Sequence, residues 1–242
     1  MAAIGGILLG ILAGWLINVL ADTIPARRTL RTTWAWPLQR LGLRVGATPS
    51  TAEDGTALPP VQRYLLVWLA AIALGCFAAA RLGWTPKALL VALEAWFFLA
   101  IAVIDLEHRL VLNRMLLPAV PLILLANLLV GEATFSSILL GAATGFGFFL
   151  VLALLAPGGM GMGDVKLAGL IGLTTGLSTI LAALLIAIFA GGIAGAVILL
   201  KNRLHHRRAR GQTMAYAPYL VMGVWIVLFD GIGLLHTYLE RL

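Results

Sequence analysis

The chain has 242 residues, of which 61% are hydrophobic and 11% are charged, and its net charge is +7. Soluble domains are about one quarter charged, so this composition excludes a soluble globular protein and predicts an all-α, polytopic bundle of membrane helices. The basic residues gather in loops between apolar segments, which is typical of topology signals rather than of nucleic-acid binding. Cys76 is the only cysteine, which excludes an intrachain disulfide and a multi-cysteine zinc site.

About eight membrane helices of roughly 20 residues each fit into this length, beside one sizeable loop. The apolar segments predict helices at 4–21, 64–82, 88–105, 115–130, 135–156, 167–176, 178–200 and 217–238. The sixth helix is short, and its glycines Gly169, Gly172 and Gly176 allow close helix packing. The first apolar segment lacks the basic residues that begin a signal peptide, so we expect it to be retained.

These segments suggest three parts: a first membrane helix (1–21), a cytoplasmic loop (22–63) and a membrane-embedded core (64–242). With the loop placed in the cytoplasm, alternation of the helices puts 14 of the 17 Lys and Arg residues on that side. Cytoplasmic loops carry an excess of Lys and Arg. We therefore expect this orientation in the inner membrane, with both termini outside the cytoplasm.

Two aspartates lie at the edges of predicted membrane helices. Asp105 closes an apolar run and opens the segment DLEHR, and Asp164 lies in the segment GMGDVK just before another apolar run. Ionisable groups near hydrocarbon are costly and mark functional sites. Both aspartates fall on the predicted cytoplasmic face, and two carboxylates that share a water can hydrolyse a peptide bond by acid–base catalysis. The pair predicts an intramembrane aspartyl peptidase.

Other interpretations of these acids stay open. Asp105 could pair with Arg109 along one helix face, and Asp164 could cap a helix that follows a tight glycine turn. In a different functional class, a proton-coupled transporter could use both aspartates with Glu94 and Asp230 as a relay. That function requires acids near the middle of the membrane, which fits Glu94 and Asp230 but not the aspartate pair.

The segments around the two aspartates resemble those of the type IV prepilin peptidases, which are membrane aspartyl proteases. The sequence IDLEHRL at 104–110 resembles the family's first aspartate segment, and GMGDVKL at 161–167 matches its second motif closely. Weaker likenesses at 16–25 and 217–220 extend the resemblance over almost the whole chain.

The resemblance implies an endopeptidase that cleaves prepilins or pseudopilins at the cytoplasmic membrane edge. Their leader would be short and basic, with glycine before the cut and an apolar helix after it. Asp105 and Asp164 would be catalytic without a metal or cofactor. A non-catalytic member that only binds pilin-like helices is a further alternative. The resemblance leaves the oligomeric state and the pilus, secretion or competence pathway open.

Four further residues are candidates for substrate binding or support. Glu107 could tune its neighbour Asp105 or be a solvated loop acid. Gly161 and Gly163 would let an extended peptide approach the catalytic carboxylate. Lys166 could pair with Asp164, although we expect it to bind lipid phosphate.

The chain departs from the family pattern in three places. Larger members carry two Cys-x-x-Cys pairs that bind zinc in the first cytoplasmic loop, whereas residues 22–63 contain no cysteine. This removes the zinc site and leaves open the family's second activity, N-methylation with S-adenosylmethionine. The arginine before Pro25 is replaced by Thr23 or Ile24, and the proline expected after Asp105 is absent from 111–113.

Overall fold

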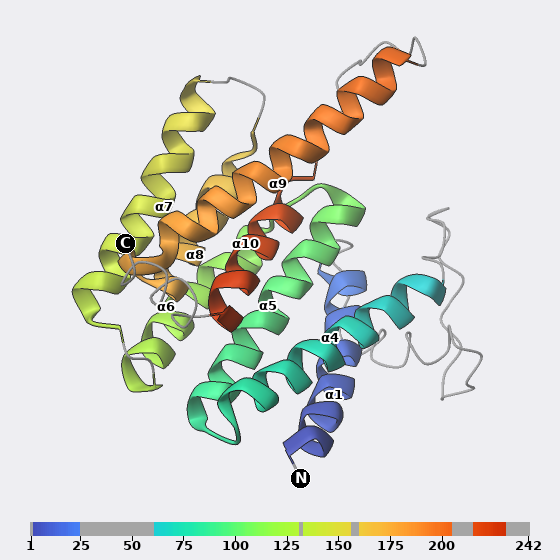
Figure 1. Cartoon of the computed structure of the whole chain (residues 1–242), viewed down its shortest axis with the longest axis vertical. Coiled ribbons are helices and arrows are strands. Elements are labelled where there is room, and N and C mark those ends of the chain that lie inside the picture. The colour runs from blue at the N-terminus through green and yellow to red at the C-terminus, as the bar shows by residue number, and fades with distance from the viewer. Residues whose placement is uncertain (1, 25–60, 131–132, 156–159, 205–214, 231–242) are drawn as a thin grey trace, which may run out of the picture. The chain divides into compact units, whose positions relative to one another are not determined.

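A computed structural model of the chain describes residues 2–24, 61–130, 133–155, 160–204 and 215–230. Within these ranges the chain forms α-helices and no strand, which confirms the all-α prediction. The helices in chain order are α1 (Ala2–Thr23), α4 (Val61–Leu82), α5 (Pro86–His108), α6 (Asn113–Val130), α7 (Phe135–Leu155), α8 (Met162–Thr175), α9 (Leu177–Leu204) and α10 (Ala217–Asp230) (Figure 1). Most of the predicted loop at 22–63 lies outside the described residues.

Six of these helices are long and apolar enough to cross a membrane, namely α1, α4, α5, α6, α7 and α9. Helix α8 and the described part of α10 have 14 residues each. At 1.5 Å per residue they extend about 21 Å, which is less than the roughly 30 Å hydrocarbon core. Among the described residues six helices therefore qualify as membrane-crossing, and the predicted count of about eight membrane helices is only approximate.

Two helix boundaries matter for the aspartates. Helix α5 continues to His108, so Asp105 lies within its last turn rather than at its end. Helix α8 begins at Met162, five residues before the predicted start, so Asp164 is part of a helix and not of the preceding loop. Both shifts arise because polar residues near a helix end can still continue its backbone hydrogen bonds.

The chain folds as two compact units, Met1–Val103 and Ile104–Leu242. In the first unit α1 packs against α4. Gly6, Gly10 and Gly14 recur every fourth residue on the α1 face that meets α4. A Cβ at Gly10 would lie 2.5 Å from the Ile72 Cα. Small residues at this spacing let two membrane helices approach closely.

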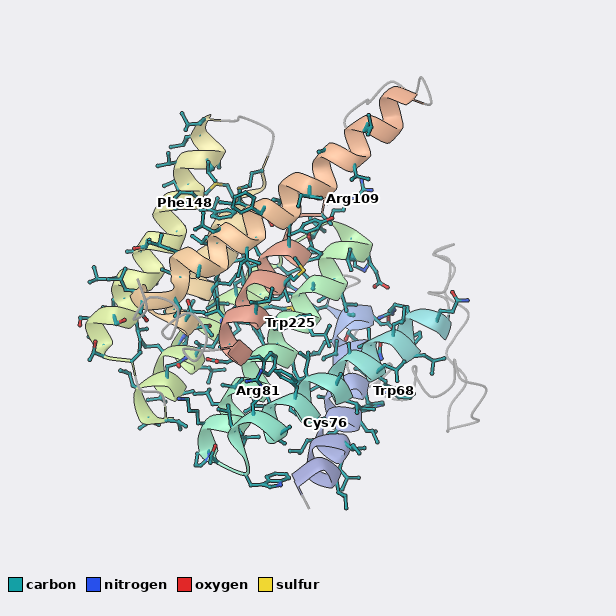
Figure 2. All side chains as sticks on the ribbon, in the orientation of Figure 1. Trp68, Cys76, Arg81, Arg109, Phe148 and Trp225 are labelled. Atoms are coloured by element: carbon teal, nitrogen blue, oxygen red, sulfur yellow. The ribbon has the colours of Figure 1, made fainter. Side chains whose placement is uncertain are left out.

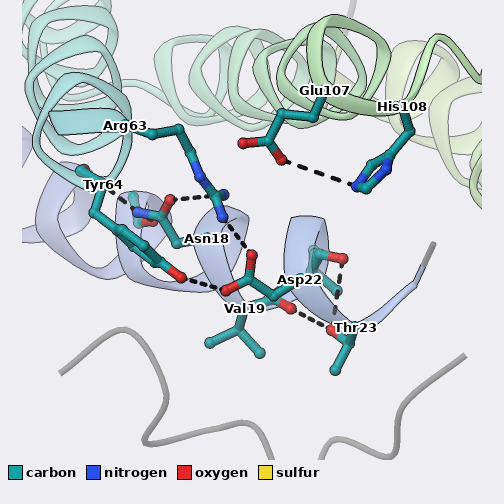
Figure 3. Close-up of polar contacts among 10 residues, drawn as sticks. Asn18, Val19, Asp22, Thr23, Arg63, Tyr64, Glu107 and His108 are labelled. Atoms are coloured by element: carbon teal, nitrogen blue, oxygen red, sulfur yellow. Dashed lines mark hydrogen bonds and ion pairs between the residues drawn. The ribbon is translucent and has the colours of Figure 1, made fainter. Parts of the chain in front are cut away.

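A polar cluster joins these two helices near the end of α1 (Figure 3). Asp22 forms an ion pair with Arg63, and the Tyr64 hydroxyl donates to Asp22 Oδ2 at 2.5 Å. Asn18 accepts a hydrogen bond from Arg63 at 3.3 Å and donates to the Gly14 carbonyl at 2.9 Å. A buried acid in this unit is thus neutralised by a cation on the neighbouring helix.

In the second unit α8 is the central helix, with α6, α7, α9 and α10 packed around it. Its residues from Asp164 to Thr174 are buried except Lys166. A Cβ at Gly172 would lie 2.0 Å from the Gly141 carbonyl oxygen of α7, so only glycine permits this crossing. The predicted close packing at Gly172 is confirmed. Gly176 instead ends α8 with a left-handed φ of 73°.

Candidate active site

Asp105 is a buried carboxylate in the last turn of α5, with 4% of its surface exposed. The helix ends three residues later, where Arg109 adopts a left-handed φ of 53° and donates its N–H to the Asp105 carbonyl at 2.8 Å (Figure 2). The Asp105 side chain accepts a hydrogen bond from the Ala217 N–H at 3.0 Å. The start of α10 therefore holds this carboxylate.

Asp164 is the third residue of α8 and is 9% exposed. Its Oδ2 accepts a hydrogen bond from the Gly161 N–H at 3.3 Å, so Asp164 caps the helix in which it lies. The pKa of Asp164 is raised from 3.8 to about 6, mainly by burial and in addition by the negative charge of Asp105, while the Gly161 hydrogen bond lowers it. The two carboxylates are thus close enough to influence one another electrostatically.

The second glycine of the GMGD segment makes room for the chain that follows Asp105. A Cβ at Gly163 would lie 2.8 Å from the Val111 Cβ and 3.3 Å from the Val111 carbonyl oxygen. A Cβ at Gly161 would meet the Asp164 carboxylate at 3.4 Å, which is an ordinary contact. Gly163 therefore allows the segment after α5 to pack on the start of α8, whereas the space around Gly161 admits a side chain.

Tyr216 and Ala217 are site neighbours to which the sequence analysis gave no role. Ala217 is fully buried and donates to Asp105. The pKa of Tyr216 is raised to about 12, mainly by burial and in addition by the negative charge of Asp164, so this side chain lies close enough to Asp164 to interact with it electrostatically. The sequence offered one signal: Pro218 marks a helix start, and a helix start exposes free N–H donors.

Each of the two remaining candidates, Lys166 and Glu107, has a polar neighbour other than the aspartate pair. Lys166 donates to the Asn113 side chain at 3.0 Å, which links α8 to the start of α6. It forms no ion pair with Asp164. The Oε2 atom of Glu107 lies 4.0 Å from the Nε2 atom of His108, the next residue in the helix (Figure 3).

The arrangement suits acid–base chemistry. Among the described residues neither Asp105 nor Asp164 forms an ion pair, and each accepts one backbone N–H. Two nearby carboxylates do not ionise independently, so a shared proton is expected, although Arg109 lies close enough to act on Asp105 electrostatically. Within the described part of the chain no group of three or more His, Cys, Asp or Glu residues could hold a metal ion. One ionised and one protonated carboxyl group can activate a water and protonate a leaving group.

Comparison with known proteins gives a consistent result. Residues 92–196 match the type IV leader peptidase family, and this window contains both aspartates. The chain is similar to three proteins named prepilin leader peptidase/N-methyltransferase. The Pseudomonas aeruginosa protein is 32% identical over 74% of this chain and 62% of its own length. The Bacillus subtilis protein is 28% identical over 88% and 83%, and the Aeromonas hydrophila protein is 32% identical over 77% and 65%.

The alignments cover less than two thirds of the Pseudomonas and Aeromonas proteins, which are therefore matched only in part. No solved structure gives a significant match to this chain.

Proposed function

Because residues 92–196 match the type IV leader peptidase family, we propose that the chain is an integral membrane aspartyl endopeptidase that removes leaders from prepilin-like proteins. The observation that carries the proposal is the pair formed by Asp105 and Asp164. Both acids are buried, both are held by backbone N–H groups, and the charge of one raises the pKa of the other. Perturbed carboxylates of this kind concentrate at catalytic sites.

The two aspartates would divide the work of hydrolysis. Asp105, held in its place by the Ala217 amide, is the base that takes a proton from water while the water oxygen attacks the scissile carbonyl carbon. Asp164, whose pKa is about 6, carries the shared proton and donates it as the carbon–nitrogen bond breaks. The products are the leader with a new carboxylate and the mature protein with a new amino group, so the proton count closes with no cofactor.

The substrate and orientation follow from the family and the charge pattern. The substrate is a protein with a short basic leader, a glycine before the cut and an apolar helix after it. Asp105 and Asp164 would face the cytoplasm, with the basic loops on the same side. In a Cys76→Ala background, a cysteine at Thr85 should react with a membrane-impermeant maleimide from outside, and a cysteine at Arg208 should not. The reverse pattern would overturn this orientation.

The relatives' names also include N-methyltransferase. Methyl transfer to the new amino terminus would use S-adenosylmethionine as the donor. The zinc-binding cysteines of the larger family members are absent from residues 22–63 of this chain. Mass spectrometry of the cleaved product with added S-adenosylmethionine separates the two activities, because methylation adds 14 Da per methyl group, roughly the mass of one CH₂.

Cleavage of a pilin-like peptide in liposomes tests the proposal. The native protein should release the leader, and Asp105→Asn and Asp164→Asn should each lower the rate by at least about 10³-fold. Size-exclusion profiles and thermal unfolding establish that each variant folds. Unchanged cleavage in both variants would rule out the aspartate mechanism.

Transport is the competing function, and the same variants distinguish it. Glu94 is buried at 4% exposure within α5, as a relay would require. Proton-coupled solute uptake that is lost with Glu94→Gln and kept with Asp164→Asn would favour a transporter. The aspartate pair at a helix end and a helix start favours the peptidase.

A further inference from the structure

The start of α10 lies outside the window that matches the peptidase family, yet it contacts the aspartate pair. Tyr216 caps α10, because its carbonyl accepts hydrogen bonds from the Tyr219 and Leu220 N–H groups. Ala217 is the first residue of the helix, and the N–H at this position has no partner within a helix. Pro218, which follows, has no N–H to offer. The Ala217 amide is therefore free to bond Asp105.

The Tyr216 ring fixes the position of that amide. Its centroid lies 5.9 Å from the ring of Phe149 in α7 and 6.1 Å from that of Tyr219 in α10. The ring also rests directly on α9, since a Cβ at Gly191 would lie 2.6 Å from its Cε2. Its hydroxyl donates to the Ala187 carbonyl at 3.5 Å. Three helices thus determine where the chain enters α10.

We propose that Tyr216 and Ala217 form a positioning element for catalysis: packing of the Tyr216 ring sets the Ala217 amide, and the amide orients the Asp105 carboxylate toward the shared water. The inference rests on the proposed function and extends it to Tyr216 and Ala217, which take no part in the bond-making and bond-breaking steps. A misplacement of a catalytic group by about 1 Å can cost roughly 100-fold in rate. Packing around Tyr216 should therefore affect kcat and leave KM nearly unchanged.

Two adjacent glycines of α9 provide a matched test that leaves Tyr216, Ala217 and both aspartates intact. In Gly191→Ala the new methyl displaces the Tyr216 ring, whereas a Cβ at Gly192 meets nothing within 4 Å. Both changes replace glycine by alanine in the same helix. We expect Gly191→Ala to lower kcat at least about tenfold with KM within about twofold, and Gly192→Ala to keep native values.

The amide itself can be tested by replacing Ala217 with lactic acid, which exchanges the backbone N–H for an ester oxygen and keeps the side chain. The matched control is the equivalent ester at Leu177, the first residue of α9, whose N–H donates to Ser137 Oγ at 3.1 Å. The Ala217 ester should lower kcat by roughly 10- to 100-fold, and the Leu177 ester should not.

We would measure kcat and KM of the native protein and of each variant on the pilin-like peptide. Loss of kcat confined to Gly191→Ala and the Ala217 ester supports the positioning element. Equal effects within either matched pair, or native kcat in the Ala217 ester, would overturn it. If the native protein cleaves no leader, the proposed function fails, and this inference fails with it for that separate reason.

Discussion

Asp22 in the first unit and Asp164 in the second both have largely buried side chains, but their neighbours differ in charge. Asp22 is bonded by the Arg63 guanidinium and the Tyr64 hydroxyl, which supply a cation and a neutral donor. Asp164 has one backbone N–H and the negative charge of Asp105 nearby. A buried carboxylate is costly, and an adjacent cation is the usual compensation.

The difference separates a structural acid from a reactive one. The Asp22–Arg63 pair joins α1 to α4 by an ion pair between the two helices. In the Asp105–Asp164 pair two like charges prevent full ionisation, so a proton is retained where chemistry can use it. The predictions below test whether the first cluster governs stability and the second governs catalysis.

The largest effect is expected when both catalytic acids are neutralised together. Asp105→Asn/Asp164→Asn should cleave no more slowly than either single variant, about 10³-fold below the native rate, because residues that act as one unit are not additive. Single-turnover rates on the pilin-like peptide measure this. Losses that multiply in the double variant would indicate two independent contributions.

Breaking the structural pair should instead lower stability. Arg63→Met leaves the Asp22 carboxylate without its cation and should cost about 2–4 kcal/mol. The double change Asp22→Asn/Arg63→Met should recover at least about half of that, because no unpaired charge remains. Thermal unfolding in detergent measures the stability, and kcat of the folded protein should stay within about twofold of native. A loss of kcat comparable to that of Asp164→Asn would erase the distinction between the clusters.

The ionised Asp164 carboxylate should lower the free energy of unfolding at neutral pH. The pKa of Asp164 is raised from 3.8 to about 6, so between these values the folded protein binds more protons than the unfolded chain. Stability from this group is present below about pH 4 and is lost as pH rises through 6. Asp164→Asn should therefore be more stable than native by roughly 1–3 kcal/mol at pH 8. Unfolding midpoints at pH 4 and 8 measure the gap, which should close at pH 4; a gap that does not depend on pH would contradict the raised pKa.

The smallest effect comes from the two glycines beside Asp164. Gly163→Ala places a methyl against Val111 and should lower kcat about tenfold by displacing the segment after Asp105. Gly161→Ala has room and should cost less than about twofold. The same peptide assay compares the two. A larger loss at Gly161 would mean that substrate, rather than Val111, occupies the space beside the motif.

Much of the fold could be predicted from the sequence, because a membrane helix requires a long apolar segment that is visible in the sequence. Each helix within the described residues was predicted, and α4 and α6 end where the apolar runs end. The start of α8 was placed too late, because a glycine-rich segment with two charges does not look apolar. Helix α8 nonetheless begins at Met162, and within this segment Asp164 and Val165 are buried.

The site was predictable only in its acids. Asp105 and Asp164 stand out because charge is rare in apolar sequence. Asp105 accepts its hydrogen bond from the backbone N–H of Ala217. Because almost every residue type has a backbone N–H, the identity of residue 217 does not reveal this contact. The distinction between Gly161 and Gly163 depends likewise on Val111, which approaches only in the folded chain. Lys166 was expected to bind lipid phosphate. Its hydrogen bond to Asn113 depends on how α6 packs against α8, which the sequence does not show.

The most direct test of the account is a titration of the Asp164 carboxyl group by infrared or NMR spectroscopy with ¹³C-labelled aspartate, in native protein and in Asp105→Asn. The account predicts half-protonation near pH 6 in the native protein, with a shift to lower pH in Asp105→Asn because the neighbouring charge is gone. Titration of Asp164 near its ordinary value of 3.8, or the same midpoint in both proteins, would contradict a coupled catalytic pair.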